Sequence, residues 1–461
     1  MNNMKIHLKD NGDPVECEAD KRPCPKRNPD GTPATHYESK EEARGAFEQM
    51  MSKIVVTPHV MNIPKDVEEI FNLLESRGVQ GYIVGGAVRD SLMSNVTPKD
   101  IDIEVQDVED IGSLAELFKG GGYHVDEVGK AFAVLTLTTK SGIDIDVSLP
   151  RQDNHVGVGH KGFDVKVSPS LSLSDAALRR DFTINALYYN PHNKTIIDTH
   201  GGLKDWREGR LRHVSDAFSE DPLRVLRAAQ FAGRFGLTID EKTVAKARRI
   251  SKSFHELPIE RVRGEWGKLL KSKSLSKGLS ALQTVGWAKF FNVENVDTKR
   301  VSDGIDLPPN LVAMAISREL PVEHRETFLH YSLNPKEAIA VLRGGKIDAP
   351  INVTKGDVYK FSRELDRSSL TISEWTKMNE IFHGKDEAIE ATARAMGVFD
   401  GADKNFITGA SILEKTGLTP GKWVGRLIAD AQNAQDNSIF TTQAGADAWL
   451  DSRLNEARDA D

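Results

Sequence analysis

Hydrophobic and polar positions change their pattern twice along the chain. The first 55 residues are mostly polar, with turn signals at Asn11-Gly12 and at 28–31 and one possible short helix at 41–51. From Ile63 onward, a helical apolar pattern is followed by short runs that predict β-strands, with helical stretches between the first of them. The helix is expected at Asp66–Arg77 and the strands at Tyr82–Val84, Ile101–Val105, Ala133–Thr138 and Ile143–Leu149.

After about Asp205 the strand signals fade, and apolar residues recur at helical spacing to the end of the chain. Among the predicted helices are Asp221–Phe235, Glu241–Lys252, Pro258–Lys271, Leu275–Gly286, Pro335–Leu342, Thr371–Phe382, Gly421–Ala434 and Gln443–Ala457. This order of elements predicts an α+β fold, with a small α/β head followed by a long, mostly helical body. We expect an accessory module at 1–55, the head domain at 63–205, a helical region at 206–290, and a helical body and tail at 291–461.

Composition narrows the class of protein. The chain has 461 residues, 39% hydrophobic and 28% charged, which is enough for about two or three domains with their own cores. No apolar run approaches the ~20 residues that span a bilayer, and the polar N-terminus does not resemble a signal peptide. Two cysteines favour a reducing compartment. We therefore expect a cytoplasmic protein that does not associate with a membrane, and the oligomeric state is left open.

Charge is unevenly distributed along the chain. The net charge is −7, but the stretch from Gly201 to Ser280 contains 18 Lys and Arg against 10 Asp and Glu. The rest of the chain then carries a net charge of −15. A basic stretch in an acidic protein can mark a phosphate-binding face. A solvated helix surface would give the same composition, so charge alone leaves both interpretations open.

The N-terminal module contains the two cysteines, Cys17 and Cys24, followed by His36. Two Cys and one His at this spacing are a weak zinc signal, because structural zinc sites usually have four ligands at tighter spacing. An accessory module without a metal is the favoured interpretation.

The first motif with chemical potential runs from Val84 to Asp90 and contains Gly85, Gly86 and Arg89. A glycine pair at the end of a strand lets the backbone approach a phosphate closely. The helix that follows would offer N–H groups to the same phosphate, and Arg89 in its first turn can reach that anion.

A pair of aspartates, Asp100 and Asp102, follows on the next predicted strand. Their i, i+2 spacing places both on one side of the strand, where they form an oxygen pair suited to Mg²⁺. Either motif alone is common as a turn or as solvated surface. In this order, the sequence resembles the nucleotidyltransferases related to DNA polymerase β.

That resemblance implies a third carboxylate on a neighbouring strand. In the later run 143–147, Asp144 and Asp146 share one face by alternation, and Asp146 is the better placed of the two. The alternative is a surface strand with two exposed acids.

Two further motifs carry polar groups in a pattern typical of nucleotide contacts. The run 179–187 contains Arg180, Asp181 and Asn185, whose side chains can bond a ribose hydroxyl and a triphosphate. In the run 220–227, Pro222 suits the first helical position, and Asp221 and Arg224 would share one face of that helix. An acceptor beside a guanidinium could read the polar edge of a base, and Arg227 continues toward the phosphates. An N-capped amphipathic helix explains the second run equally well.

With these residues in this order, the chain resembles the class II CCA-adding enzymes, the bacterial-type tRNA nucleotidyltransferase family that also contains bacterial poly(A) polymerases. The resemblance covers about Ile63–Val285 and returns more weakly at 406–411 and 417–425. It implies Mg²⁺-dependent addition of CCA to the tRNA 3′ end from CTP and ATP. It also implies that 206–290 contains the nucleotide-recognition neck and an RNA-binding region.

Individual residues match the family's motifs. Asp100 and Asp102 match the metal-binding pair, and the remaining matched positions contact the nucleotide: Gly86 and Arg89 in the first motif, Arg180 and Asp181 at the ribose, Asp221 and Arg224 at the base, and Arg227. The run Leu149–Phe163, with His160, resembles the loop linked to the switch from C to A addition.

Two departures from the family's pattern stand out. Gln230 occupies a position where many members carry an arginine, which puts one phosphate contact in doubt. The chain has no His-Asp dipeptide, so we expect no phosphohydrolase activity of the kind that some members carry.

Alternatives remain at this point. A poly(A) polymerase, or an enzyme that adds only CC or only A, would share the motifs, although the acidic end of the chain (436–461) modestly favours tRNA. A non-catalytic RNA-binding protein is less consistent with both Asp100 and Asp102 being present.

Overall fold

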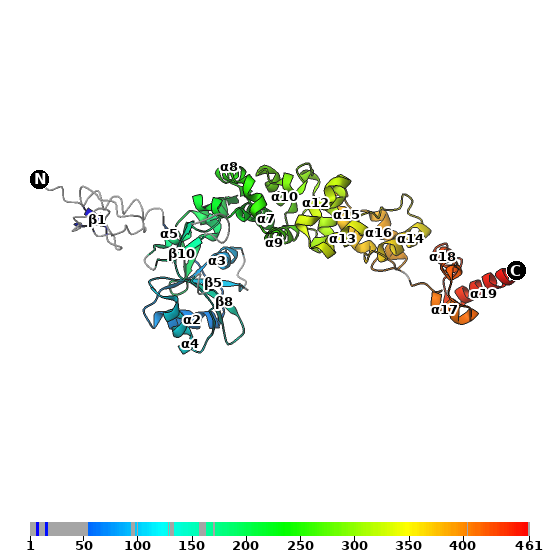
Figure 1. The fold of residues 1–461 in the computed structure, drawn as a ribbon, viewed down its shortest axis with the longest axis horizontal. Coiled ribbons are helices and arrows are strands. Elements are labelled where there is room, and N and C mark those ends of the chain that lie inside the picture. The colour runs from blue at the N-terminus through cyan, green and yellow to red at the C-terminus, as the bar shows by residue number, and fades with distance from the viewer. Residues whose placement is uncertain are drawn as a thin grey trace. The chain divides into compact units, whose positions relative to one another are not determined.

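The computed structural model describes residues 6–8, 14–16, 54–93, 97–98, 100–127, 129, 133–155, 163–168, 171–402 and 404–459. The fold is α+β, with a sheet-containing first part and a helical second part, as the sequence predicts (Figure 1). The chain divides into two compact units: Met1–Ala232 with Leu237–Leu257, and Gly233–Gly236 with Pro258–Asp461.

The first unit is built on an eight-stranded sheet. Its strand order is β3-β12-β11-β4-β5-β8-β7-β6, and all neighbours are antiparallel except β5 and β8, which are parallel. The strands are β3 (Val55–Pro58), β4 (Gly81–Val84), β5 (Ile101–Val105), β6 (His124–Asp126), β7 (Val134–Thr138), β8 (Asp144–Ser148), β11 (Leu187–Asn190) and β12 (Thr195–Asp198).

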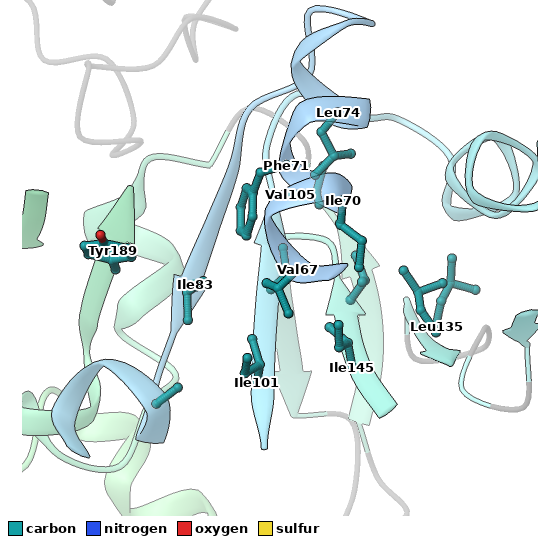
Figure 2. Close-up of a cluster of buried hydrophobic side chains, with 14 of the residues drawn as sticks. Val67, Ile70, Phe71, Leu74, Ile83, Ile101, Val105, Leu135, Ile145 and Tyr189 are labelled. Atoms are coloured by element: carbon teal, nitrogen blue, oxygen red, sulfur yellow. The ribbon is translucent and has the colours of Figure 1, made fainter. Parts of the chain in front are cut away.

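One face of this sheet forms the main hydrophobic core. Helix α2 (Lys65–Glu75) buries four residues at helical spacing, and α4 (Ile111–Gly120) begins at Asp110, whose side chain caps the helix by accepting a hydrogen bond from the Ser113 N–H. Figure 2 shows Val67, Ile70, Phe71 and Leu74 of α2 next to Ile101, Leu135 and Ile145 of the sheet. Alternation along the strands therefore determines which side chains enter the core.

The opposite face of the sheet carries a smaller cluster made by Val84, Ala177, Ala186 and Tyr188. The segments that contribute to this side and continue the unit are α3 (Gly86–Ser91), α5 (Leu173–Ala177), η2 (Thr183–Asn185), α6 (Gly202–Arg207), β13 (Arg210–Leu211), η3 (Asp216–Glu220), β14 (Thr238–Ile239), α8 (Glu241–Arg249) and η4 (Ser251–Glu256). Helix α7 (Leu223–Phe235) begins in the first unit and ends in the second.

The second unit is helical throughout its described part. Its elements are α9 (Ile259–Leu270), α10 (Leu275–Thr284), η5 (Ala288–Phe291), η6 (Thr298–Arg300), α11 (Pro309–Glu319), α12 (Val322–Ser332), α13 (Pro335–Gly344), α14 (Lys355–Asp366), α15 (Ile372–His383), α16 (Glu387–Ala395), α17 (Gly409–Thr416), α18 (Lys422–Asp436) and α19 (Gln443–Asp459). Trp266 packs edge-on against Phe291 and Phe328 in its core. In the described residues, no helix combines the length and the apolar content that a membrane span requires.

The predicted strands and helices occur close to their expected bounds. Two strands that the sequence did not predict, β11 and β3, lack an alternating pattern for identifiable reasons. All four residues of β11 are buried, so its sequence does not alternate. The exposed β3 lies at the edge of the sheet, where burial imposes no pattern. In the N-terminal module, β1 (Ile6–Leu8) pairs with β2 (Pro14–Glu16). The possible helix at 41–51 and the weak zinc signal from Cys17, Cys24 and His36 lie outside the described residues.

Candidate functional site

The glycine pair of the first motif forms a tight connection between β4 and α3. Gly85 has φ 73° and ψ −130°, a conformation that L-residues with a side chain rarely adopt. A Cβ atom at Gly85 would lie 3.2 Å from Nη1 of Arg180 and 3.6 Å from Oδ2 of Asp102. The backbone conformation therefore favours glycine here, and a side chain would also crowd the Arg180 guanidinium. Gly86 starts the helix, and a Cβ there would lie 3.5 Å from Nη2 of Arg89.

The strand register aligns the acidic residues of two neighbouring strands. Asp102 of β5 is the direct partner of Asp146 on the parallel strand β8, and Asp146 is opposite Thr136 of β7. The Thr136 hydroxyl donates a hydrogen bond of 2.7 Å to Oδ1 of Asp146. Asp100 immediately precedes β5, and all three carboxylates are exposed. Of the two acids on β8, Asp146 is therefore the direct neighbour of Asp102.

The electrostatics around the adjacent carboxylates of β5 and β8 favour the binding of a cation. Crowding by protein atoms strips water from Asp102 and raises its pKa, the charges of Asp146 and Asp100 raise it further, and Arg180 opposes the shift. Among the described residues, no basic side chain forms an ion pair with Asp100, Asp102 or Asp146. Within the described residues, the charge of Arg180 therefore acts on Asp102 without forming an ion pair with it.

The donor set suits a divalent ion that is shared with a substrate. The described part of the chain holds no group of three or more His, Cys, Asp or Glu side chains placed to bind a metal by themselves. Mg²⁺ is commonly held by one or two carboxylates together with substrate phosphates rather than by a complete protein cage. The pair on β5, with Asp146 beside it, fits that arrangement.

A buried carboxylate that the sequence analysis missed lies two residues after Asp102 on the same side of β5. Glu104 is fully buried, and its Oε2 accepts from Nη2 of Arg179 at 3.2 Å and Nη2 of Arg180 at 3.5 Å. The spacing from Asp102 was the available signal, because i and i+2 share a face. The two arginines that pair with it are distant in sequence, so the pairing itself was not evident.

The remaining motif residues form one connected hydrogen-bond network. Oδ2 of Asp181 accepts from Nε of Arg227 at 2.8 Å, and its Oδ1 accepts from Nδ2 of Asn185 at 2.9 Å. Oδ1 of Asn185 in turn accepts from Nη1 of Arg89 at 2.6 Å. Burial alone would raise the pKa of Asp181, but the charge of Arg227 and the hydrogen bonds from Asn185 and Arg227 outweigh it and lower that pKa.

An aromatic ring joins the two arginines of this network. The guanidinium carbons of Arg89 and Arg227 lie 5.1 and 5.2 Å from the centre of the Phe231 ring, within cation–π range. Phe231 follows Arg227 by one turn of α7, so the helix brings the ring to the network. The sequence analysis did not single out this residue.

Asp221 lies just before the helix that contains Arg224, whereas the sequence predicted both residues within it. Helix α7 begins at Leu223 rather than at Asp221, because Asp221 has an extended backbone and its Oδ1 accepts from the Leu223 N–H at 3.1 Å. Arg224 donates from Nη1 to the carbonyl of Ala217 at 2.7 Å and from Nη2 to the carbonyl of Arg179 at 2.6 Å. Asp221 therefore caps the helix that Arg224 belongs to, as the amphipathic-helix interpretation required.

The structure describes Gln230 and part of the run that resembles the switching loop. Gln230, which stands at a usual arginine position, is buried on α7. The run Leu149–Phe163 contains β9 (Arg151–His155), which pairs with β10 (Phe163–Val167), while 156–162, including His160, lie outside the described residues.

Comparisons with known proteins show which parts of the chain resemble described families. Residues 81–212 match the family described as the poly(A) polymerase head domain, and residues 236–294 match a domain described as the probable RNA and SrmB-binding site of polymerase A. A multifunctional CCA protein of Vibrio vulnificus is 38% identical over 211 residues, 44% of this chain and 49% of that protein. One from Stenotrophomonas maltophilia is 40% identical over 206 residues, 44% of this chain and 48% of that protein. The chain thus spans about half the length of these curated relatives.

Solved structures share the fold over most of the chain. A Bacillus stearothermophilus CCA-adding enzyme in complex with CTP superposes with a TM-score of 0.66 at 20% identity, covering 86% of this chain and 99% of that one. A Thermotoga maritima CCA-adding enzyme complexed with tRNA has a TM-score of 0.56 at 18% identity, with the same coverage. At these identities the likeness establishes the fold.

Proposed function

We propose that this chain, whose residues 81–212 carry a poly(A) polymerase head domain, is a template-independent nucleotidyltransferase that adds CCA to the 3′ end of tRNA. The substrates are CTP and ATP, and pyrophosphate is released. The names of its relatives and fold neighbours, which are CCA proteins and CCA-adding enzymes, support this choice of substrate.

The observation that carries the proposal is the strand register at the end of β4. It places Asp102 beside Asp146, next to the Gly85 turn that Arg180 also approaches. Exposed carboxylates next to a glycine turn that an arginine approaches are the arrangement that nucleotidyl transfer needs. In a non-catalytic RNA-binding protein, nothing would require acidic residues at this place.

Each group has a defined role in this proposal. Arg89, Arg180 and Arg227 bind the triphosphate, with Gly85 and Gly86 leaving room for it. Asp181 and Asn185 orient the ribose, and their fixed network means that little side-chain entropy is lost on binding. Asp221 and Arg224, at the start of α7, read the polar edge of the base.

The cofactor in this proposal is Mg²⁺, held by Asp100 and Asp102 with Asp146 as the third carboxylate. When bound, it would activate the attacking 3′-hydroxyl and stabilise the leaving pyrophosphate. The protein's own part is to hold these carboxylates adjacent through the β5–β8 pairing, and Thr136 fixes the orientation of Asp146.

The chain's parts take roles along its length. We assign 63–205 as the catalytic head, 206–290 as the nucleotide-recognition neck and RNA-binding region, and 291–461 as body and tail. The exposed basic residues of α8 are offered as part of the RNA surface. The run Leu149–Phe163 is assigned to the switch from C to A addition. We also infer a cytoplasmic location, because tRNA and nucleoside triphosphates are available there.

The matched head domain takes its description from poly(A) polymerases, so poly(A) synthesis is the second candidate. One experiment separates the possibilities. Purified protein is incubated with tRNA lacking its 3′ CCA, with tRNA ending in C or CC, and with single labelled nucleotides. Addition of two C and one A, followed by arrest, is expected. Long A tails would establish a poly(A) polymerase, only C or only A a partial enzyme, and no addition with any RNA would refute the proposal.

A further inference from the structure

Glu104 is a buried carboxylate that has no role in the proposed mechanism. It is the next residue after Asp102 on the same face of β5, and it is fully buried. Its Oε2 accepts hydrogen bonds from Arg179 and Arg180, and its Oε1 accepts from Nε2 of Gln106 at 3.3 Å. A buried carboxylate is tolerated only with such partners, so Glu104 and the two arginines depend on one another.

Arg180 has a second anionic group within its surroundings. Its Nη1 and Oδ2 of Asp102 both lie next to the Gly85 turn. In the described part of the chain no ion pair joins Arg180 to Asp102. Nη2 of Arg180 is engaged by Glu104, and its Nη1 donates to the carbonyl of Asn185 at 3.5 Å. Two carboxylates, Glu104 and Asp102, are thus potential partners for one guanidinium, and the structure has it on the buried one.

The two alternatives have opposite consequences for metal binding. A guanidinium on Asp102 would occupy carboxylate oxygens that a divalent cation needs and would supply a competing positive charge. A guanidinium on Glu104 leaves those oxygens open. The Glu104 contact is also shielded from water, which strengthens it relative to a contact at the exposed Asp102.

We propose that Glu104 is a positioning residue that keeps Arg180 off Asp102, and so reserves the Asp102 carboxylate for the divalent cation. This inference rests on the proposed function, because it presupposes a metal at Asp102. It assigns to a residue outside the recognised motifs the task of separating the cation-binding group from the anion-binding group of the same site.

The test measures metal binding directly, with Mn²⁺ as the probe, because Mn²⁺ takes the same oxygen ligands as Mg²⁺ and its binding is visible by electron paramagnetic resonance. Glu104→Gln keeps the size and one acceptor oxygen but removes the charge. We expect the Mn²⁺ dissociation constant to rise by about fivefold, the scale of one partly exposed ion pair. The Mg²⁺ concentration for half-maximal nucleotide addition should rise with it, and added Mg²⁺ should restore the rate.

A matched control comes from the second unit. Asp436 of α18 is also a buried carboxylate, and it pairs with the buried Arg363 of α14. Asp436→Asn removes one charge from a buried arginine pair without touching the site. It should lower the melting temperature comparably and leave Mn²⁺ affinity unchanged, so an effect common to both variants would indicate destabilisation and overturn the proposal.

The double substitution Glu104→Gln/Arg180→Gln and the single substitution Arg180→Gln form a cycle that separates positioning from a direct effect of the Glu104 charge. Arg180→Gln should change Mn²⁺ affinity by less than about twofold in the wild-type background but restore it in the Glu104→Gln background. Equal effects in both backgrounds would mean that the two charges act independently and would overturn the proposal. With the competing guanidinium gone, Mn²⁺ affinity of the double variant should return to within about twofold of the wild type. A double variant as weak as Glu104→Gln would overturn the proposal.

If Glu104→Gln does not fold, Glu104→Asp replaces it, because it keeps the charge but shortens the reach to Arg180. Weaker Mn²⁺ binding is expected for Glu104→Asp, and wild-type affinity would overturn the proposal.

The outcomes also distinguish this inference from the proposed function. A wild-type protein that binds no Mn²⁺, either alone or with CTP present, and adds no nucleotide to any RNA overturns both. Wild-type binding with unchanged affinity in folded Glu104→Gln overturns only the role of Glu104. Mn²⁺ behaviour as expected, without nucleotide addition to any RNA, supports Glu104 and refutes the proposed function.

Discussion

On one face of the eight-stranded sheet, β5 contributes Ile101, Ile103 and Val105, none of which is more than 2% exposed. On the other face the same five-residue strand contributes Asp102 and Glu104. The apolar face is held together by burial against α2 and α4, which needs no particular partner for each side chain. The polar face depends on specific partners, because a buried charge must be paired while a reactive one must stay available.

The difference shows how the sheet keeps its stability separate from its chemistry. Glu104 and Asp181 are buried and each is paired with arginine, whereas Asp102 and Asp146 remain exposed and have no ion-pair partner among the described residues. The paired acids hold the arginines in place. The unpaired acids are free to bind a cation, and the raised pKa of Asp102 reflects their mutual repulsion as well as the loss of water.

Substitution of Asp102 should have the largest effect on activity and almost none on folding. Asp102→Ala should reduce nucleotide addition by more than about a hundredfold. Loss of a residue that only supports a metal ligand already lowers metal affinity or activity by about 10–100-fold, and Asp102 is proposed as a ligand itself. At neutral pH, the melting temperature of Asp102→Asn should be no lower than that of the wild type. The pKa of Asp102 is raised in the folded state. The folded protein therefore loses stability as pH rises above the pKa that Asp102 has in the unfolded state. Activity assays and thermal melts check both points, and activity within about tenfold of wild type would contradict the metal assignment.

The neighbouring residue on the other face should behave in the opposite way. Ile103→Ala should lower the free energy of unfolding by about 2–5 kcal/mol, because it opens a cavity in the core. Ile103→Val, the matched control, should cost about 0.5–1.5 kcal/mol. Both variants should retain activity within about threefold when assayed well below their melting temperature. A loss as severe as that of Asp102→Ala in folded protein would show that the two faces are not separate.

This separation also explains which parts of the molecule could be predicted from sequence. The alternation of Ile101, Asp102 and Ile103 predicts a strand with one buried and one polar face, and the structure has that strand at the expected residues. The helices of the body follow from their apolar spacing, and α15 begins at Ile372, directly after Thr371, whose side chain caps the helix. Local pattern is sufficient where one element meets one core.

Partners that are distant in sequence could not be predicted in the same way. The acid pair on β8 was visible, but only the parallel register assigns Asp146 to Asp102. The pairing of Glu104 with Arg179 and Arg180 joins segments 75 and 76 residues apart. Arg224 is held by the carbonyl of Arg179, which lies 45 residues earlier in the chain. A single sequence carries no signal for such contacts, because they arise from the tertiary fold.

Base choice offers an intermediate test of the polar face. Asp221→Ala should reduce discrimination of CTP and ATP against UTP and GTP by about 1–3 kcal/mol, the cost of leaving a polar group of the base unpaired. Triphosphate affinity should change less, because Arg89 and Arg227 are retained. Competition assays with mixed nucleotides measure the ratio, and Glu116→Ala on α4, an exposed acid on the other side of the sheet, is the control. Unchanged selectivity would place base reading elsewhere.

The smallest expected effect lies outside the sheet, on a surface whose charges face solvent. Arg248 and Arg249 end α8, Lys252 lies in η4, and all three are exposed within the basic stretch of the sequence. If they contact the acceptor stem of a tRNA, binding there is electrostatic and follows shape and phosphates rather than sequence. Replacing all three with glutamine should lower the slope of log affinity against log salt by up to about 2–3 units, at about 0.7–0.9 per contact.

This last effect should be the same for different tRNAs, since phosphate contacts carry no sequence information. The control is the triple replacement of Arg77, Lys119 and Lys140, which lie toward the α2 and α4 side of the sheet and remove the same charge. That variant should keep the wild-type slope. Equal slopes for wild type, test variant and control would mean that α8 carries ordinary solvated charges. The C-terminal helices would then be the next candidate for the RNA surface, and the basic stretch would serve the nucleotide alone.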